Sequence, residues 1–119
     1  MKLPNHVKVE FIQEDLNGLN TLIGSRLIGL DCEWRTAVNY KMRQIQQVSI
    51  LQISNEETCF VVDMNRAPVK PLNKILNQIL NNLDTTVLGF SFHNDLQMLQ
   101  KSRIHLKLGK NYVDLQVKA

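Results

Sequence analysis

The chain has 119 residues, of which 44% are hydrophobic and 21% are charged. These proportions are typical of one small folded domain and argue against both a disordered chain and a second domain. The net charge of +3 is mildly basic and the Lys and Arg residues are dispersed, so charge alone does not identify a polyanionic partner.

The two cysteines and the N-terminus bear on where the protein works. Cys32 and Cys59 lie in apolar, strand-like runs, which predicts two buried thiols in a reducing compartment rather than a disulfide or a zinc site. No window approaches the roughly 18 apolar residues of a membrane span, and the N-terminus has no long apolar run. We therefore expect an intracellular protein without membrane contact, in the nucleus or in the cytoplasm.

Hydrophobic periodicity predicts elements in the order β-α-β-β-β-α-β-α-β. A polar stretch after the second strand is predicted to be a loop, and a stretch with two prolines is predicted to break the pattern before the second helix. The last apolar segment fits either a strand or the start of a helix. The predicted strands are residues 7–12, 26–34, 48–54, 58–64, 87–92 and 112–117, the helices are 13–23, 72–83 and 94–101, and the loop is 35–47.

The order of these elements predicts a mixed sheet with helices packed against it. Strands 26–34, 48–54 and 58–64 are joined by short links, so they should form an antiparallel meander, and the later strand–helix–strand segment should add parallel pairing. The nearly continuous apolar start of 26–34 is typical of a central strand that is covered on both faces. The fold class is therefore α/β, in a single domain over residues 1–119.

Two acids stand at the end of the predicted strand 26–34. Asp31 and Glu33 are two residues apart, so their side chains should point to the same face, about 7 Å apart along the strand. Adjacent carboxylates repel unless a positive charge lies between them, and oxygen ligands suit Mg²⁺ or Mn²⁺. The same pattern also fits two solvent-facing residues at a strand end.

A third acid, Asp95, is predicted near the start of the helix that follows strand 87–92. A carboxylate there interacts favourably with the helix dipole, so Asp95 also fits a simple helix cap. If strands 26–34 and 87–92 are parallel neighbours, their carboxyl ends meet at one edge of the sheet. The three acids would then converge on one cleft.

Four segments, LIGLDCEW, VSILQIS, TCFVVDM and GFSFHNDLQML, follow one another in an order that resembles DEDD-type 3′–5′ exonucleases. The resemblance is strongest to the ribonuclease D, Werner-helicase-exonuclease and mutator-type branch, and it extends from about residue 7 to residue 116. It implies a ribonuclease-H-like fold. Asp31 and Glu33 match the first exonuclease motif of that family, and Asp95 matches the second.

The resemblance also implies a chemistry, namely hydrolysis of phosphodiester bonds at the 3′ ends of DNA or RNA with release of nucleoside monophosphates. Two Mg²⁺ or Mn²⁺ ions would serve the reaction. Asp31 would contact both ions, Glu33 would hold the ion that activates water, and Asp95 would support the other ion. All three would be catalytic residues.

One motif of the family has no counterpart after Asp95. In the family a Tyr or His is followed four residues later by an Asp, whereas Tyr112 and Asp114 are only two apart. We therefore expect a C-terminally incomplete domain with a partly formed two-metal site, either as a fragment or as a natural short form. The alternative function is a catalytically deficient module that binds nucleic acid or protein. Exposed apolar surface near 113–117 would favour self-association or a partner that completes the domain.

Three residues near the acids are candidates for nucleic-acid contact, each with a plainer interpretation. Trp34 fits base stacking or core packing, and Arg35 fits a phosphate contact or a solvated loop. His93 fits a phosphate contact or an ordinary turn. Asp63, at the end of its strand, is predicted to be a turn residue.

Overall fold

The computed structural model of the chain describes residues 7–38, 44–89, 92–101, 103–108 and 110–115. Strands and helices alternate within this part largely as the periodicity predicts. The elements are β1 (Lys8–Ile12), the 3₁₀ helix η1 (Asn17–Leu22), β2 (Leu27–Val38), β3 (Gln44–Ser54), β4 (Thr58–Asp63), α1 (Val69–Leu80), β5 (Thr86–Gly89), α2 (Phe92–Lys101) and β6 (Tyr112–Asp114).

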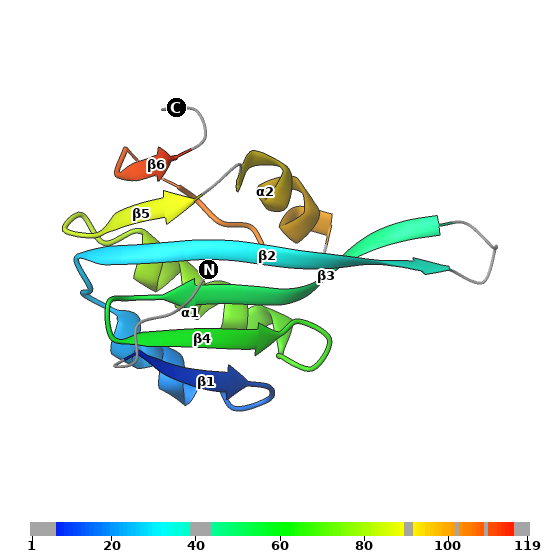
Figure 1. The fold of residues 1–119 in the computed structure, drawn as a ribbon, viewed down its shortest axis with the longest axis horizontal. Coiled ribbons are helices and arrows are strands. Elements are labelled where there is room, and N and C mark those ends of the chain that lie inside the picture. Colours follow the sequence, from blue (N-terminus) through cyan, green and yellow to red (C-terminus); the bar gives the residue numbers. More distant parts are fainter. Residues whose placement is uncertain (1–6, 39–43, 90–91, 102, 109, 116–119) are drawn as a thin grey trace.

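The six strands form one mixed sheet with the order β1-β4-β3-β2-β5-β6, seen face-on in Figure 1. Strands β2, β3 and β4 make the predicted antiparallel meander. Strand β5 pairs in parallel with β2 and β6 in parallel with β5, while β1 pairs in parallel with β4. The α/β class and the mixed sheet flanked by helices are therefore confirmed, and β2 is a central strand.

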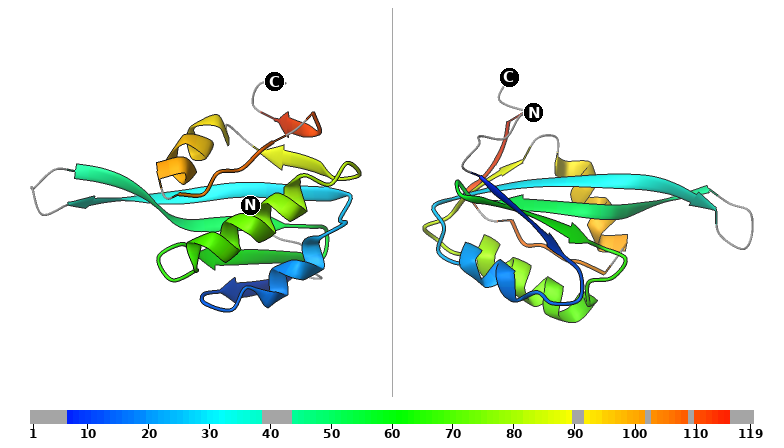
Figure 2. Two further views of the ribbon diagram at one scale, coloured as in Figure 1. Left: turned by 180° about the vertical axis from the view of Figure 1, so that it is seen from behind. Right: turned by 60° about the horizontal axis from the view of Figure 1, so that its bottom comes forward.

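The hydrophobic core lies on one face of this sheet. Helices η1 and α1 run across that face, as the view from behind in Figure 2 shows. Leu30 and Cys32 of β2 point into the core, whereas Asp31 and Glu33 alternate with them and are exposed. No described helix covers the face that carries the two acids. The predicted double cover of β2 is therefore wrong for the described elements, because its apolar run gives way to alternating acids after Leu30.

The first predicted helix is shorter and tighter than its leucine spacing indicates. Only Asn17–Leu22 is helical, and it is a 3₁₀ helix. Asn and Gly are poor helix formers, and the carboxylate of Asp15 accepts a hydrogen bond from the backbone N–H of Asn17 at 2.9 Å, which favours a turn there. Leu19 and Leu22 are still fully buried, so the periodicity identifies the packed residues although it misses the type of helix.

The predicted loop at 35–47 is wrong, because most of it is strand. Strand β2 continues to Val38, and strand β3 begins at Gln44. The two strands pair along this stretch, from Arg35 opposite Gln47 to Val38 opposite Gln44. The hairpin projects beyond the body of the sheet (Figure 1). Polar residues do not prevent this pairing, because the ladder is formed by backbone groups.

Helix α1 begins and ends earlier than predicted. Pro68 occupies the position before its first residue and Pro71 lies in its first turn, where the missing N–H has no helical acceptor to lose. The prolines therefore start the helix rather than delay it. The helix ends at Leu80, and Leu83, predicted on its apolar face, is 90% exposed.

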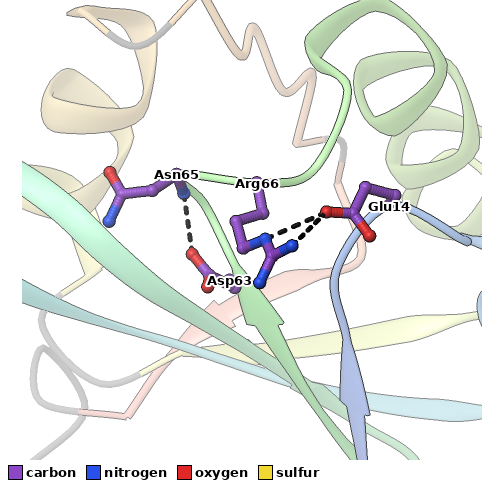
Figure 3. A network of polar contacts seen from close by, with 4 residues as sticks. All are labelled: Glu14, Asp63, Asn65 and Arg66. Carbon is purple, nitrogen blue, oxygen red and sulfur yellow. Dashed lines mark hydrogen bonds and ion pairs between the residues drawn. The ribbon is translucent and has the colours of Figure 1, made fainter.

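The link after β4 is held by local polar contacts, drawn in Figure 3. Asp63 accepts a hydrogen bond from the backbone N–H of Asn65 at 2.9 Å, which confirms the predicted turn residue. Arg66 forms an ion pair with Glu14 at 2.8 Å, and the two side chains are 55% and 65% exposed. An ion pair this exposed contributes less than about 1 kcal/mol, so it orients two loops rather than supporting the fold.

The described helices include none with the length and apolar character needed to cross a membrane.

Candidate active site

Strands β2 and β5 bring the candidate acids to the same edge of the sheet. The two strands are parallel, and their last paired residues are Leu30 and Gly89. Strand β5 ends there, whereas β2 continues with Asp31. Helix α2 starts at Phe92 and packs against β2 and β3. The chain therefore turns into α2 at the point where β2 presents its acids.

Asp31 and Glu33 present two exposed carboxylates on one face of β2. One oxygen of Asp31 accepts a hydrogen bond from the backbone N–H of Cys32 at 2.9 Å. Neither carboxylate forms an ion pair with a side chain in the described part of the chain. Two like charges held on one strand, with no basic partner among the described side chains, are a fitting pair of ligands for a hard divalent cation.

A β-bulge follows directly after these acids. Glu33 lies opposite Ile50, but Trp34 lies opposite Val48, so the pairing of β2 with β3 shifts at this point. A bulge bends its strand and increases the local twist, and bulges are frequent beside active sites because they redirect side chains. Here the bulge separates the acid-bearing part of β2 from the projecting hairpin.

Asp95 lies in the first turn of α2, as predicted, and it is only 6% exposed. Burial raises the pKa of the neighbouring Cys32 thiol, and the negative charges of Asp95 and then Asp31 raise it further. Both carboxylates therefore lie close enough to one thiol to act on it electrostatically. This places Asp95 at the same part of β2 as Asp31 and not across the domain.

The described residues contain no three His, Cys, Asp or Glu side chains already arranged to hold a metal ion. Asp31 and Glu33 open onto one face of β2, while Asp95 approaches β2 from α2 and is buried. The structure therefore brings the three acids to one edge of the sheet without closing them into a single ligand set.

The exposed acids line a hollow of ≈ 800 Å³. This volume falls within the range of small-molecule sites. Its lining combines the two carboxylates with one amide and several apolar side chains, so it presents both charge and contact area to a ligand. Its lining residues include Asp31, Glu33, Gln52, Val61, Leu88 and Leu115.

The three candidate nucleic-acid contacts are placed to different degrees. His93 is exposed on α2, two residues before Asp95, and residues at that spacing do not face each other on a helix. The side chains of Trp34 and Arg35 lie outside the described residues. All three contacts stay predictions.

Both cysteines are buried, as predicted, and each residue is 8% exposed. Burial also raises the pKa of Cys59. Cys32 lies on the helix-covered face, whereas Cys59 lies among the residues that line the hollow. We assign neither thiol a chemical role, since both favour the protonated form.

Sequence reasoning missed the part that Tyr112 and Asp114 play beside the acids. A carboxylate oxygen of Asp114 accepts a hydrogen bond from the backbone N–H of Phe92, the first residue of α2, at 3.2 Å. Burial, then the charge and hydrogen bond of Asp114, and then the charge of Asp95 raise the pKa of Tyr112 to about 12. The two partners of this contact are 22 positions apart, so no local pattern signals it.

The surface expected near 113–117 is partly described. Leu115 is 48% exposed and Val113 is half-buried, while residues 116–119 lie outside the described part. Association through this surface stays a prediction.

Comparisons with known proteins agree with this fold. A family model described as 3′–5′ exonuclease matches residues 8–119. None of the curated protein sequences compared with the chain matches it. Among solved structures, the exonuclease domain of Nibbler from Aedes aegypti is similar with a TM-score of 0.77 and 19% identity, over 99% of this chain and 57% of that one.

Two trypanosomal structures are also similar. The catalytic core of RRP6 from Trypanosoma brucei gives a TM-score of 0.72 at 19% identity, over 96% of this chain and 30% of that one. RNase D from the same organism gives 0.68 at 20% identity, over 92% of this chain and 38% of that one. The chain thus spans less than two thirds of each of these proteins. The family match covers nearly all of its length, and the chain belongs to the 3′–5′ exonuclease family.

Proposed function

We propose that the protein hydrolyses phosphodiester bonds at nucleic-acid 3′ ends in a reaction that depends on Mg²⁺ or Mn²⁺. The observation that carries the proposal is the meeting of two elements at one edge of the sheet. Strand β2 passes the end of its parallel neighbour β5 and presents Asp31 and Glu33, while α2 brings Asp95 against the same strand.

Enzymes of this family use divalent metal ions generally. The donors present here fit such an ion, because they are carboxylate oxygens and because no described basic side chain neutralises Asp31 or Glu33. Asp31 and Glu33 would hold metal from the exposed face of β2, with Asp95 supporting it from α2. A bound ion would stabilise charge on the phosphate and lower the pKa of a water molecule.

The chain's own residues would contribute placement of the substrate. The hollow beside the acids has apolar walls at Val61, Leu88 and Leu115, against which a terminal base or sugar can pack. Gln52 lies opposite Asp31 on β3 and on the same face, so its amide can hydrogen-bond a nucleotide while the acids act on the phosphate. Placement of this kind supplies much of the rate in phosphoryl transfer.

RNA is the substrate that we propose first. Trypanosoma brucei RNase D, one of the similar structures, has been determined in complex with the RNA U12. The charge of this chain agrees with a polyanionic ligand, since its net value is +3.

The test is degradation of a 5′-labelled single-stranded RNA by the full-length protein in Mn²⁺, with a DNA of the same sequence in parallel. We expect products that shorten stepwise from the 3′ end. Asp31→Asn should slow this at least about 100-fold, because loss of a metal ligand removes several kcal/mol of charge stabilisation. Asp84→Asn, an exposed acid outside the site, should retain wild-type activity. Internal cleavage, or equal rates for Asp31→Asn and wild type, would refute the proposal.

A second candidate is a nucleic-acid-binding module without hydrolysis. It is favoured by one structural observation, that the described His, Cys, Asp and Glu side chains include no three arranged to hold a metal ion. The two functions separate in the same experiment when binding is followed by fluorescence anisotropy. A module without chemistry retains the labelled RNA intact in Mn²⁺, whereas an exonuclease shortens it.

A further inference from the structure

Strand β6 is attached to the end of β5, directly before the chain enters α2. The two strands are parallel, with Val87 opposite Tyr112 and Gly89 opposite Asp114. The backbone N–H of Leu115 donates to the carbonyl of Gly89 at 2.8 Å. Strand β6 is therefore bonded to the last residue of β5, and Figure 1 shows it at the edge of the sheet.

Asp114 reaches from β6 to the start of α2. Its Oδ2 accepts a hydrogen bond from the backbone N–H of Phe92 at 3.2 Å and another from the Tyr112 hydroxyl at 3.4 Å. The first N–H groups of a helix have no acceptor within the helix, and a negative charge is favoured beside them. Asp114, which lies on strand β6, thus caps the N-terminus of helix α2.

Packing restricts the same junction. The Tyr112 ring lies against the fully buried ring of Phe92, with centroids 6.4 Å apart at 50°. A Cβ atom added at Gly89 would lie 2.7 Å from the Tyr112 hydroxyl oxygen and 2.8 Å from the Cβ of Phe92. The start of α2 therefore has little freedom to move toward or along β5.

Helix α2 carries Asp95 three residues after this capped start. Asp95 is buried against the sheet, so its position relative to β2 follows that of the first turn of α2. We propose that Asp114, held by Tyr112, is a positioning residue that sets where Asp95 stands relative to Asp31 and Glu33. The proposal rests on the proposed function, since it assigns Asp114 a role in the same metal site.

Asp114 acts through α2 and is not itself a ligand beside Asp31. Its register partner is Gly89, which in turn lies opposite Leu30, so these residues share the helix-covered face. Asp31 and Glu33 project from the other face of the sheet. This also explains the two-residue spacing of Tyr112 and Asp114, which places both side chains on one face of β6.

The experiment compares Asp114→Ala and Asp114→Asn with the control Asp84→Ala in the full-length protein. Two readouts do not depend on activity: Mn²⁺ affinity by calorimetry, and hydrogen exchange of the amides from Phe92 to Asp95. Partners that orient metal ligands typically affect affinity about 10–100-fold, so Asp114→Ala should weaken Mn²⁺ binding by that factor. Loss of the cap should speed amide exchange about fivefold.

The conservative variant separates positioning from general stability. Asp114→Asn keeps an oxygen acceptor for the Phe92 N–H, so its Mn²⁺ affinity should fall less than that of Asp114→Ala, within about tenfold of wild type. Should Asp114→Ala not fold, Tyr112→Phe replaces it, because it removes the hydroxyl bonded to the Asp114 carboxylate. We expect Tyr112→Phe to bind Mn²⁺ about threefold more weakly than wild type, with faster exchange at Phe92.

Two outcomes overturn the positioning role. One is Mn²⁺ affinity in Asp114→Ala equal to that in Asp84→Ala, and the other is wild-type affinity in Tyr112→Phe when Asp114→Ala does not fold. The proposed function fails in a different way, namely if wild-type protein does not shorten RNA or if Asp31→Asn is as active as wild type. An active, Asp31-dependent enzyme whose Mn²⁺ binding ignores Asp114 would leave the function standing and remove only the positioning role.

Discussion

Replacing Gly89 with alanine tests how closely β6 and α2 pack at the edge of the candidate site. The new Cβ atom would lie 2.7 Å from the Tyr112 hydroxyl oxygen, 3.1 Å from its Cε1 and 2.8 Å from the Cβ of Phe92. Ordinary carbon contacts are about 3.5–4.0 Å, so three atoms must move. The Phe92 Cβ is attached to the helix backbone, and it moves only if α2 moves.

The change in the free energy of unfolding caused by Gly89→Ala follows from two opposing effects. Overpacking of this kind costs about 1–3 kcal/mol, and the cost here belongs in the upper half of that range because the Phe92 Cβ can move only together with α2. Alanine also reduces the entropy of the unfolded chain relative to glycine, which returns up to about 1 kcal/mol. The free energy of unfolding should therefore fall by about 1–3 kcal/mol, which lowers Tm by roughly 4–12 °C in a domain of this size.

Gly29→Ala is the matched control, because Gly29 lies on β2, the parallel neighbour of β5. The Cβ atom there would meet only the Ser54 Oγ at 3.2 Å, and that hydroxyl can rotate. Its unfolding free energy should stay within about 1 kcal/mol of wild type. The assay is urea unfolding followed by circular dichroism. Equal midpoints for Gly89→Ala and Gly29→Ala would refute the close packing of β6 on the start of α2.

Three further predictions concern burial and ionisation. Leu76→Ala should lower the free energy of unfolding by about 2–5 kcal/mol in thermal unfolding because Leu76 is fully buried. Leu83→Ala should change that free energy by less than about 0.5 kcal/mol, because Leu83 is 90% exposed. Equal effects of the two substitutions would contradict the end assigned to α1. Alkylation followed by mass spectrometry should modify Cys59 before Cys32, because only Cys32 has nearby acids that raise its pKa beyond the effect of burial; the reverse order would contradict this placement. The pKa of Tyr112 is raised from 10.0 to about 12. The contribution of the neutral Tyr112 side chain to stability is therefore complete below pH 10 and is lost as pH rises through 12. Tyr112→Phe should lose less stability over that interval than wild type.

The sequence predicts the order of the elements because apolar residues mark the faces that pack. The apolar spacing along α1 identifies five residues that the structure buries. The errors arise where backbone bonding overrides side-chain polarity. Five of the eight residues in 35–38 and 44–47 are polar, yet both segments extend a hairpin. Pro71, which breaks a helix interior, is accepted in the first turn of α1.

The candidate site is only partly visible in the sequence. Asp31 and Glu33 share a face because they are two residues apart on a strand, and Asp95 follows from the strand-to-helix pattern. The contact between Asp114 and Phe92 has no local pattern, since it depends on β6 pairing with β5. Predicting contacts of that kind requires knowledge of which strands pair, because strand pairing decides which distant residues lie beside the acids.

Mn²⁺ binding tests most directly whether the acids of β2 and α2 form one metal site. Calorimetry on wild type, Asp31→Asn, Asp95→Asn and the double variant measures their coupling, with Asp84→Asn as the control. We expect each single variant to weaken Mn²⁺ binding at least about tenfold, since affinity depends on the charge of the ligands. The double variant should lose less Mn²⁺ binding free energy than the two single variants lose in sum, because both acids act on the same ion. Wild-type affinity in the double variant would show that Asp31 and Asp95 hold no metal and would contradict the account.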